Sequence, residues 1–376
     1  IGPALGGVII VGLGVGMPFI FNAISFLGVV GALLWWKPEQ TDTVHLPAER
    51  FAGAIRTGMR FARESQPLRS TLIRAAGFFL FASAYWALLP LIARDLLAGG
   101  AAFYGILLAA IGVGALIGAV ALPKLKALLG PNKLVAVGCL TTALVLVIFS
   151  TVDNQYVAVV TSLLAGASWL AVLSNLNVSA QTALPEWVRA RGLSVLLIIY
   201  FGSMAGGSLL WGRVADGIGI PQTLLIAAAG AVIAVPLTWR WKLHLGAKLD
   251  LTPSMHWTPN IFDLDVEEDR GPVMVTIEYL IDPNLAPEFL DLIRKLGENR
   301  RRDNSFSWGV FEDAERPGRY LEYFMVESWL EHSRQHHRVT EADKNLEELV
   351  RNYHLGKEPV KVGHFVAPSR DAMKKK

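Results

Sequence analysis

Residues 169–194 read WLAVLSNLNVSAQTALPEWVRARGLS. An apolar helix is predicted over the first part of this stretch, and it contains amide and hydroxyl side chains but no charge before Glu186. Polar side chains are costly in lipid unless they face a helix bundle or a water-filled cavity. The helix ends in a short basic turn with Arg189 and Arg191, and a new apolar run begins at Leu193. The stretch therefore predicts a membrane-spanning helix inside a bundle.

The charges of the chain are divided unevenly. Residues 1–243 carry 16 Lys and Arg against 8 Asp and Glu, whereas residues 271–368 carry 13 against 17. An apolar, basic part joined to an acidic part predicts a membrane domain and a soluble domain. We place the membrane domain at 1–243, a linker at 244–270, the soluble domain at 271–368 and a basic tail at 369–376.

Apolar runs of membrane-spanning length recur between Gly, Pro and charged residues. A truncated span opens the chain, a complete one covers residues 18–36, and the others are predicted at 71–93, 102–123, 134–151, 156–184, 192–214 and 221–242. Basic residues gather on alternate connections, which the positive-inside rule places in the cytoplasm together with everything after Trp241. We expect about eight spans in lipid, in the plasma or inner membrane, with the soluble domain in the cytoplasm.

The polar connection after the second span contains Arg56, Arg60 and Arg63 on one face of a predicted helix. This pattern is typical of an amphipathic helix on an anionic membrane surface. A solvated linker helix gives the same pattern.

From Pro272 the periodicity changes to strands and helices in the order βαββαβ. This is the order of a ferredoxin-like α+β domain. Two alternatives are open for its apolar strand residues, which either pair with a second copy in a homodimer or pack on the domain's own helices. These residues are Val273, Val275, Ile277, Trp308, Val310, Tyr323 and Met325.

Several segments resemble exporters of the major facilitator superfamily. Gly2, Pro3 and Gly6 resemble the glycine-proline motif of their fifth helix, and FNAISFLGVVGALLWW resembles the sixth helix. LPEWVRARGLS with GSMAGGSLLWGRVADGIG resembles the tenth-to-eleventh helix region of the branch that includes the enterobactin exporter group and transmembrane secretion effectors. VESWLEHSRQHHRVTEADK resembles the signature of a ferredoxin-like extension found in that branch.

The resemblance implies a proton-driven exporter of twelve helices that works by alternating access, of which this chain supplies the fifth to the twelfth. We therefore expect a fragment. Its implied substrate is a small, partly hydrophobic molecule such as a siderophore or a drug. No Asp or Glu occupies the middle of a predicted span, so no proton-carrying carboxylate is identified.

Two groups of residues are candidates for a substrate cavity. Ser168, Asn175, Ser179 and Thr182 fall within about 60° of one another on a helix, so they line either a cavity or a neighbouring helix. Phe78, Phe81 and Tyr85 form an aromatic stripe that either contacts a flat substrate or packs in the bundle or against lipid. Close helix packing, and rocking during transport, is expected at Gly2, Pro3, Gly6, Gly114, Gly118, Gly202 and Gly206.

The soluble domain offers no catalytic constellation and no cofactor motif. His332, His336 and His337 suggest a metal site, but the charged residues around them indicate a solvated segment. The fold resembles cofactor-independent monooxygenases, which keeps a membrane-tethered enzyme as one alternative, and a dimerising or regulatory module is another. Nucleic-acid binding is not expected of an acidic domain with one short basic cluster.

Overall fold

The computed structural model describes residues 9, 13, 14, 16–37, 47, 49, 51–243, 250–257 and 270–368. The chain divides into two compact units. The helical unit comprises Ile1–Val44, Thr71–Val178 and Ile198–Leu243. The mixed unit comprises His45–Ser70, Ser179–Leu197 and His244–Lys376.

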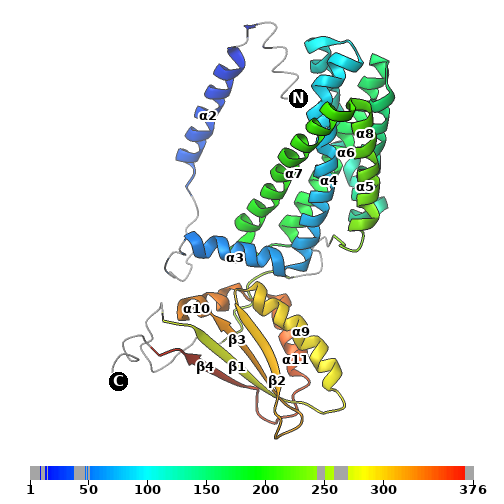
Figure 1. The fold of residues 1–376 in the computed structure, drawn as a ribbon. Coiled ribbons are helices and arrows are strands. Elements are labelled where there is room, and N and C mark those ends of the chain that lie inside the picture. The colour runs from blue at the N-terminus through cyan, green and yellow to red at the C-terminus, as the bar shows by residue number, and fades with distance from the viewer. Residues whose placement is uncertain are drawn as a thin grey trace. The chain divides into compact units, whose positions relative to one another are not determined.

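Long apolar helices dominate the helical unit (Figure 1). They are α2 (Met17–Trp35), α4 (Gln66–Leu91), which continues into the π-helical turn η1 (Ile92–Leu96), α5 (Gly100–Thr151), α6 (Gln155–Thr182), α7 (Arg189–Ile218) and α8 (Ile220–Thr238). In the described part of the chain, six helices are long and apolar enough to cross a membrane. The predicted multi-pass helical bundle is confirmed, and each predicted span between residues 18 and 242 overlaps one of these helices.

Helix α5 is two helices joined at a kink. Gly130 has a φ of 67° and a ψ of 170°, outside the helical region, and Pro131 follows it. Glycine tolerates this φ because it has no Cβ, and proline fits the first turn of a new helix because it needs no N–H donor there. The kink explains how one element of 52 residues holds both the 102–123 and the 134–151 span.

Glycines bring α5 and α6 into close contact. A Cβ at Gly114 would overlap the Leu163 carbonyl, and one at Gly118 would lie 2.9 Å from Ala167 Cα. No described atom lies within 4 Å of a Cβ at Gly202 or Gly206; on α7 it is Gly207 that approaches α4. Gly2, Pro3 and Gly6 lie outside the described residues.

The αβ domain, residues 270–368, contains one antiparallel sheet in the order β2-β3-β1-β4. Its elements are β1 (Val273–Leu280), α9 (Ala286–Arg302), β2 (Ser307–Glu312), β3 (Arg319–Val326), α10 (Trp329–Arg338), α11 (Glu341–Arg351) and β4 (Lys361–Val366) (Figure 1). Ser328 caps α10, and Thr340 with Asp343 forms a capping box at α11. These caps satisfy N–H groups that the first turn leaves free.

The two faces of the sheet differ in burial. Val273, Val275 and Ile277 are buried in a core with Phe289 and Ile293 of α9. Trp308 and Val310 pack against the same core. Of the residues predicted for a dimer surface, these five therefore pack on the domain's own helices, because the side chains of a strand alternate between its faces. Tyr323 and Met325 alternate with the buried residues of β3.

The mixed unit also contains α3 (Phe51–Glu64). Arg56 pairs with Glu327 at 2.7 Å, and Arg60 Nη1 donates to the Asn304 carbonyl at 2.9 Å. These two arginines, predicted to face lipid or water, therefore contact the αβ domain. The exposed apolar residues Phe51, Ile55 and Met59 lie along another face of the helix.

The close approach of α5 and α6 predicts a position-dependent effect of adding one methyl group. Gly114→Ala must displace the Leu163 backbone, and overpacking costs about 1–3 kcal/mol. Gly202→Ala, the matched control, meets no described neighbour and favours helix formation. We expect Gly114→Ala to lower the thermal unfolding temperature of the purified full chain and Gly202→Ala to leave it unchanged or raise it. Equal effects would contradict the observed packing.

Candidate functional site

The polar face of α6 makes contacts with α5. Ser168 Oγ lies 3.3 Å from Thr142 Oγ1 and donates to the Ala165 carbonyl at 3.0 Å. Asn175 Nδ2 donates to the Pro131 carbonyl at 2.9 Å, beside the kink of α5. Asn175 is fully buried, and its Oδ1 has no hydrogen-bond partner among the described residues. Packing of α6 on α5 thus explains the hydrogen bond of Asn175 Nδ2, but it gives Asn175 Oδ1 no partner.

Further along α6, Ser179 is buried and Thr182 Oγ1 donates to the Ser179 carbonyl at 3.2 Å. This bond lies within the helix, and threonine hydroxyls commonly bond to a backbone carbonyl of their own helix in this way. Through this bond, the Thr182 hydroxyl donates to its own helix and not to a neighbouring one.

The predicted aromatic stripe on α4 divides into two clusters. Phe78 and Tyr85 pack against Trp169 of α6, with ring centroids 5.9 and 6.5 Å away. Phe81 instead packs against Trp211 of α7 at 6.0 Å. The structure therefore brings Phe78 and Tyr85 next to Trp169, the residue after Ser168, and places Phe81 elsewhere.

Two polar atoms of this aromatic cluster, on the adjacent residues Tyr85 and Trp86, are buried and make no hydrogen bond of good geometry in the described structure. They are the Tyr85 hydroxyl and Trp86 Nε1. Buried hydroxyl and indole groups usually have a hydrogen-bond partner. Asn175 Oδ1, Ser162 Oγ and Arg74 Nη2 are further buried polar atoms of the described helices that lack a partner.

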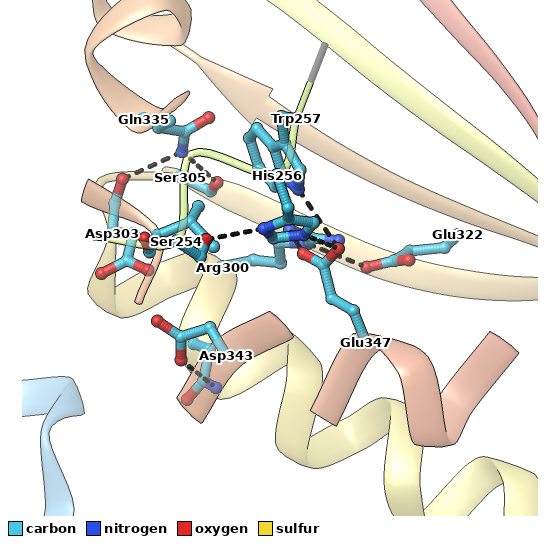
Figure 2. A network of polar contacts seen from close by, with 12 residues as sticks. Ser254, His256, Trp257, Arg300, Asp303, Ser305, Glu322, Gln335, Asp343 and Glu347 are labelled. Carbon is cyan, nitrogen blue, oxygen red and sulfur yellow. Dashed lines mark hydrogen bonds and ion pairs between the residues drawn. The ribbon is translucent and has the colours of Figure 1, made fainter. Parts of the chain in front are cut away.

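The αβ domain contains a buried ion network centred on Arg300 of α9. Arg300 Nη1 lies 2.7 Å from Glu347 of α11, and Arg300 Nε lies 3.4 Å from Glu322 of β3. All three side chains are buried. Figure 2 shows Arg300 between the two carboxylates. A buried charge needs such partners because its removal from water costs several kcal/mol.

Each carboxylate of the network receives further hydrogen bonds. Glu322 accepts from the Tyr279 hydroxyl and from Trp308 Nε1, both at 3.0 Å. Glu347 accepts from Trp257 Nε1 at 3.2 Å, and His256 Nε2 lies 3.1 Å from it (Figure 2). Burial alone would raise the pKa of Glu347, but Arg300 and His256 outweigh it and lower the pKa to about 2.

Residues 250–257, which the sequence places in the linker, lie along the αβ domain. Ser254 N donates to the Val339 carbonyl at 2.9 Å, and Pro253 forms a bridge with Thr340. Ser254 Oγ also lies 2.6 Å from His256 Nδ1. The segment thereby orients His256 and Trp257 toward Glu347.

A cavity of 280 Å³ lies beside the network, lined by His332, His336 and His364 together with Trp257 and Arg300. The His332 ring centroid is 5.0 Å from both other histidines. Burial lowers the pKa of His332 to about 3 and that of His336 to about 4, and neighbouring imidazoles add to both shifts. The pKa of His364 is lowered by burial as well. These three imidazoles are therefore neutral at pH 7.

Among the described residues, no group of three His, Cys, Asp or Glu side chains is arranged to hold a metal ion. The expectation that the 331–338 segment is solvated is wrong, because His332, Gln335 and Arg338 of α10 are buried. Gln335 Nε2 donates to the Asp303 carbonyl, and Arg338 pairs with Glu49 and Glu331. The helical pattern alone places these polar side chains at the surface. They are buried instead, because residues distant in sequence supply their hydrogen bonds and ion pairs.

Comparison with known protein families identifies the family of this chain. A family model described as transmembrane secretion effector matches residues 1–372. The chain belongs to this family. No curated protein matches the chain. This branch of the major facilitator superfamily, together with the six apolar helices, makes the protein a multi-pass membrane transporter. The family match spans the αβ domain as well as the helices.

Removing the central cation of the transporter's αβ domain tests its role in stability. Arg300→Met leaves Glu322 buried without its cation and leaves Glu347 with only the more exposed Arg351 and His256; breaking a buried pair costs about 3–5 kcal/mol. Arg294→Met is the matched control on α9, because Arg294 is exposed and pairs only with Asp291 in the described structure; surface changes are usually within about 0.5 kcal/mol. Thermal unfolding of the full chain is monitored by tryptophan fluorescence. We expect a much lower unfolding temperature for Arg300→Met than for the wild type, and no such decrease for Arg294→Met. Similar temperatures would contradict the assigned network.

Acidification between pH 6.5 and pH 4 should destabilise the fold through His332. The unfolded chain binds a proton there near pH 6.5 and the folded chain only near pH 3, so stability falls as the pH falls, by at most about 1.4 kcal/mol per pH unit. Asp303, whose pKa burial raises to about 6, acts in the opposite sense. We therefore compare variants: the pH-dependent loss should be smaller in His332→Leu than in the wild type. His337→Leu, a histidine variant outside the cavity lining, is measured as the matched control. A stability-versus-pH curve of His332→Leu that runs parallel to the wild-type curve would refute the assignment to His332.

Proposed function

We propose that the protein is a secondary active exporter of small, partly hydrophobic molecules such as siderophores or drugs. In this proposal export is coupled to the proton gradient and proceeds by alternating access around a site within the helices. Family membership supports the exporter class. Proton coupling and the substrate class rest on the resemblance to major facilitator exporters.

One observation carries the choice of site: Asn175 is fully buried in an apolar helix and its Oδ1 has no partner among the described residues. A buried polar group left without a partner costs about 1–3 kcal/mol, which a hydrogen bond to a bound ligand would offset. We propose a substrate cavity that includes Asn175, Ser168, Ser179 and Thr182, with Phe78 and Tyr85 as aromatic contacts. Phe81, which packs on Trp211, contributes indirectly.

The helices of this exporter are proposed to span the plasma or inner membrane with the αβ domain in the cytoplasm. The support is the concentration of basic residues on alternate connections, including Lys124, Lys126 and Lys133 at the kink of α5. Rocking of α5 against α6 at Gly114 and Gly118 is proposed as part of the transport cycle, because small residues allow closely packed helices to shift.

For the αβ domain we propose a ferredoxin-like fold that regulates the exporter and forms homodimers. The strand order β2-β3-β1-β4, with α9 after β1 and α10 and α11 after β3, supports this fold. Exposed Phe311 and Phe365 on the strands support a sheet surface for a second copy. A tethered monooxygenase is the second candidate, favoured by the histidine-lined cavity.

The exporter proposal is tested by efflux from cells that express the chain. A panel of hydrophobic dyes and a catechol siderophore are the probes, with and without an ionophore that collapses the proton gradient. We expect gradient-dependent efflux, reduced about fivefold to tenfold in Asn175→Ala, since a buried hydrogen bond contributes about 1 kcal/mol.

Asn177→Ala is the matched control, because the Asn177 amide bonds to the Leu173 carbonyl of its own helix. Equal amounts of protein in the membrane must be verified for each variant. Efflux that continues without the gradient would refute proton coupling, and an equal loss in both variants would refute the cavity assignment. Absence of efflux for every probe would count against the proposed substrate class.

A further inference from the structure

The cavity of the αβ domain has a separate chemistry from the α6 site. Its 280 Å³ is close to the lower end of small-molecule sites, about 300 Å³. Apolar side chains of three strands form one wall: Val275, Ile277, Phe324 and Val362. Histidines of α10 and β4 supply polar groups beside this wall.

His332 is the decisive side chain. It is 1% exposed, and neither ring nitrogen makes a hydrogen bond of good geometry among the described residues, although the Gln335 side chain interacts with the ring. One neighbouring side chain cannot satisfy both the donor and the acceptor nitrogen of a neutral imidazole with good geometry here. Leaving a buried polar group unsatisfied costs about 1–3 kcal/mol. Because His332 lines the cavity, a molecule bound there can supply the missing partner.

The charge balance of the cavity selects a neutral molecule. Its two arginines, Arg300 and Arg351, are both paired with Glu347, and Arg300 also pairs with Glu322. His256, which also lines the cavity, contacts the same Glu347 carboxylate. The neutral imidazoles of His332 and His336 add no charge. A neutral imidazole has one donor and one acceptor nitrogen, so it can bond a hydroxyl or a carbonyl group.

We infer that this cavity binds a small, neutral, mainly apolar molecule that carries a hydroxyl or carbonyl group, with His332 as its hydrogen-bond partner. The apolar wall holds the body of the molecule, and Trp257 closes one side of the site. This site goes beyond the proposed transport function and does not depend on it, because none of its residues belongs to the helical unit.

Binding of 2-naphthol to the purified full chain in lipid nanodiscs tests the inference. The fluorescence of the probe is titrated with protein, and empty nanodiscs are subtracted. We expect one saturable site in the wild type, with binding weakened about fivefold to tenfold in His332→Leu, the effect of one buried hydrogen bond. Naphthalene, which lacks the hydroxyl, and 2-naphthoate, which carries a charge, should bind more weakly than 2-naphthol.

Three variants make the result specific. Val362→Phe fills the cavity and should abolish binding, which keeps the test informative if His332→Leu does not fold. His337→Leu, outside the cavity lining, should bind as the wild type does, and Asn175→Ala tests whether the probe binds within the helices instead. Binding that is unsaturable, or unchanged in both His332→Leu and Val362→Phe, would overturn the inference. Tighter binding of 2-naphthoate would overturn the choice of a neutral ligand, and loss in Asn175→Ala alone would move the site to the helices.

Discussion

Polar groups that are cut off from water must find partners, and this constraint shapes both units. In the helical unit, Asn175 donates to the Pro131 carbonyl, at the point where the α5 backbone leaves helical geometry. In the αβ domain, Arg300 holds Glu322 and Glu347, which come from a strand and a helix distant in sequence. The first contact joins two helices and the second joins three elements around one core. In both units, the polar contacts fix the arrangement that apolar packing alone leaves loosely specified.

The sequence predicts the helices well because their determinants are local. Apolar length defines each span, and Gly130 with Pro131 marks the break in α5. Alternation in β1 likewise predicts which residues face a core, whereas in β3 the named residues Tyr323 and Met325 lie on the other face from the buried Phe324 and Val326. The sequence does not predict which neighbouring element each helix face contacts. The periodicity of α6 separates two polar faces, but only the structure shows that Asn175 meets the α5 kink and that Gly207, rather than Gly202 or Gly206, approaches α4.

The Arg300 network could not be predicted from local pattern. Glu322, Glu347 and Arg300 are charged residues in ordinary-looking elements, and charge within an amphipathic helix normally indicates a solvated face. Their burial depends on partners 22 and 47 residues away. His256 and Trp257 were missed for a related reason: a polar, proline-containing stretch is typical of a linker, and its attachment to α10 and α11 comes from backbone bonds that any sequence can make.

Helix α10 links the cavity to the other segments of the mixed unit. His332 and His336 line the cavity, whereas Arg338, near the end of the same helix, bonds Glu49 at 2.8 Å and lies over the Trp187 ring at 4.7 Å. The ten residues of α10 make about 2.8 turns, and the backbone hydrogen bonds of these turns hold the two ends of the helix at a fixed distance. Any shift that tightens contacts around His332 must therefore be accommodated at Arg338. Glu49 precedes α3 and Trp187 follows α6 in the chain, so α10 ties two connections between helices to the αβ domain within the mixed unit.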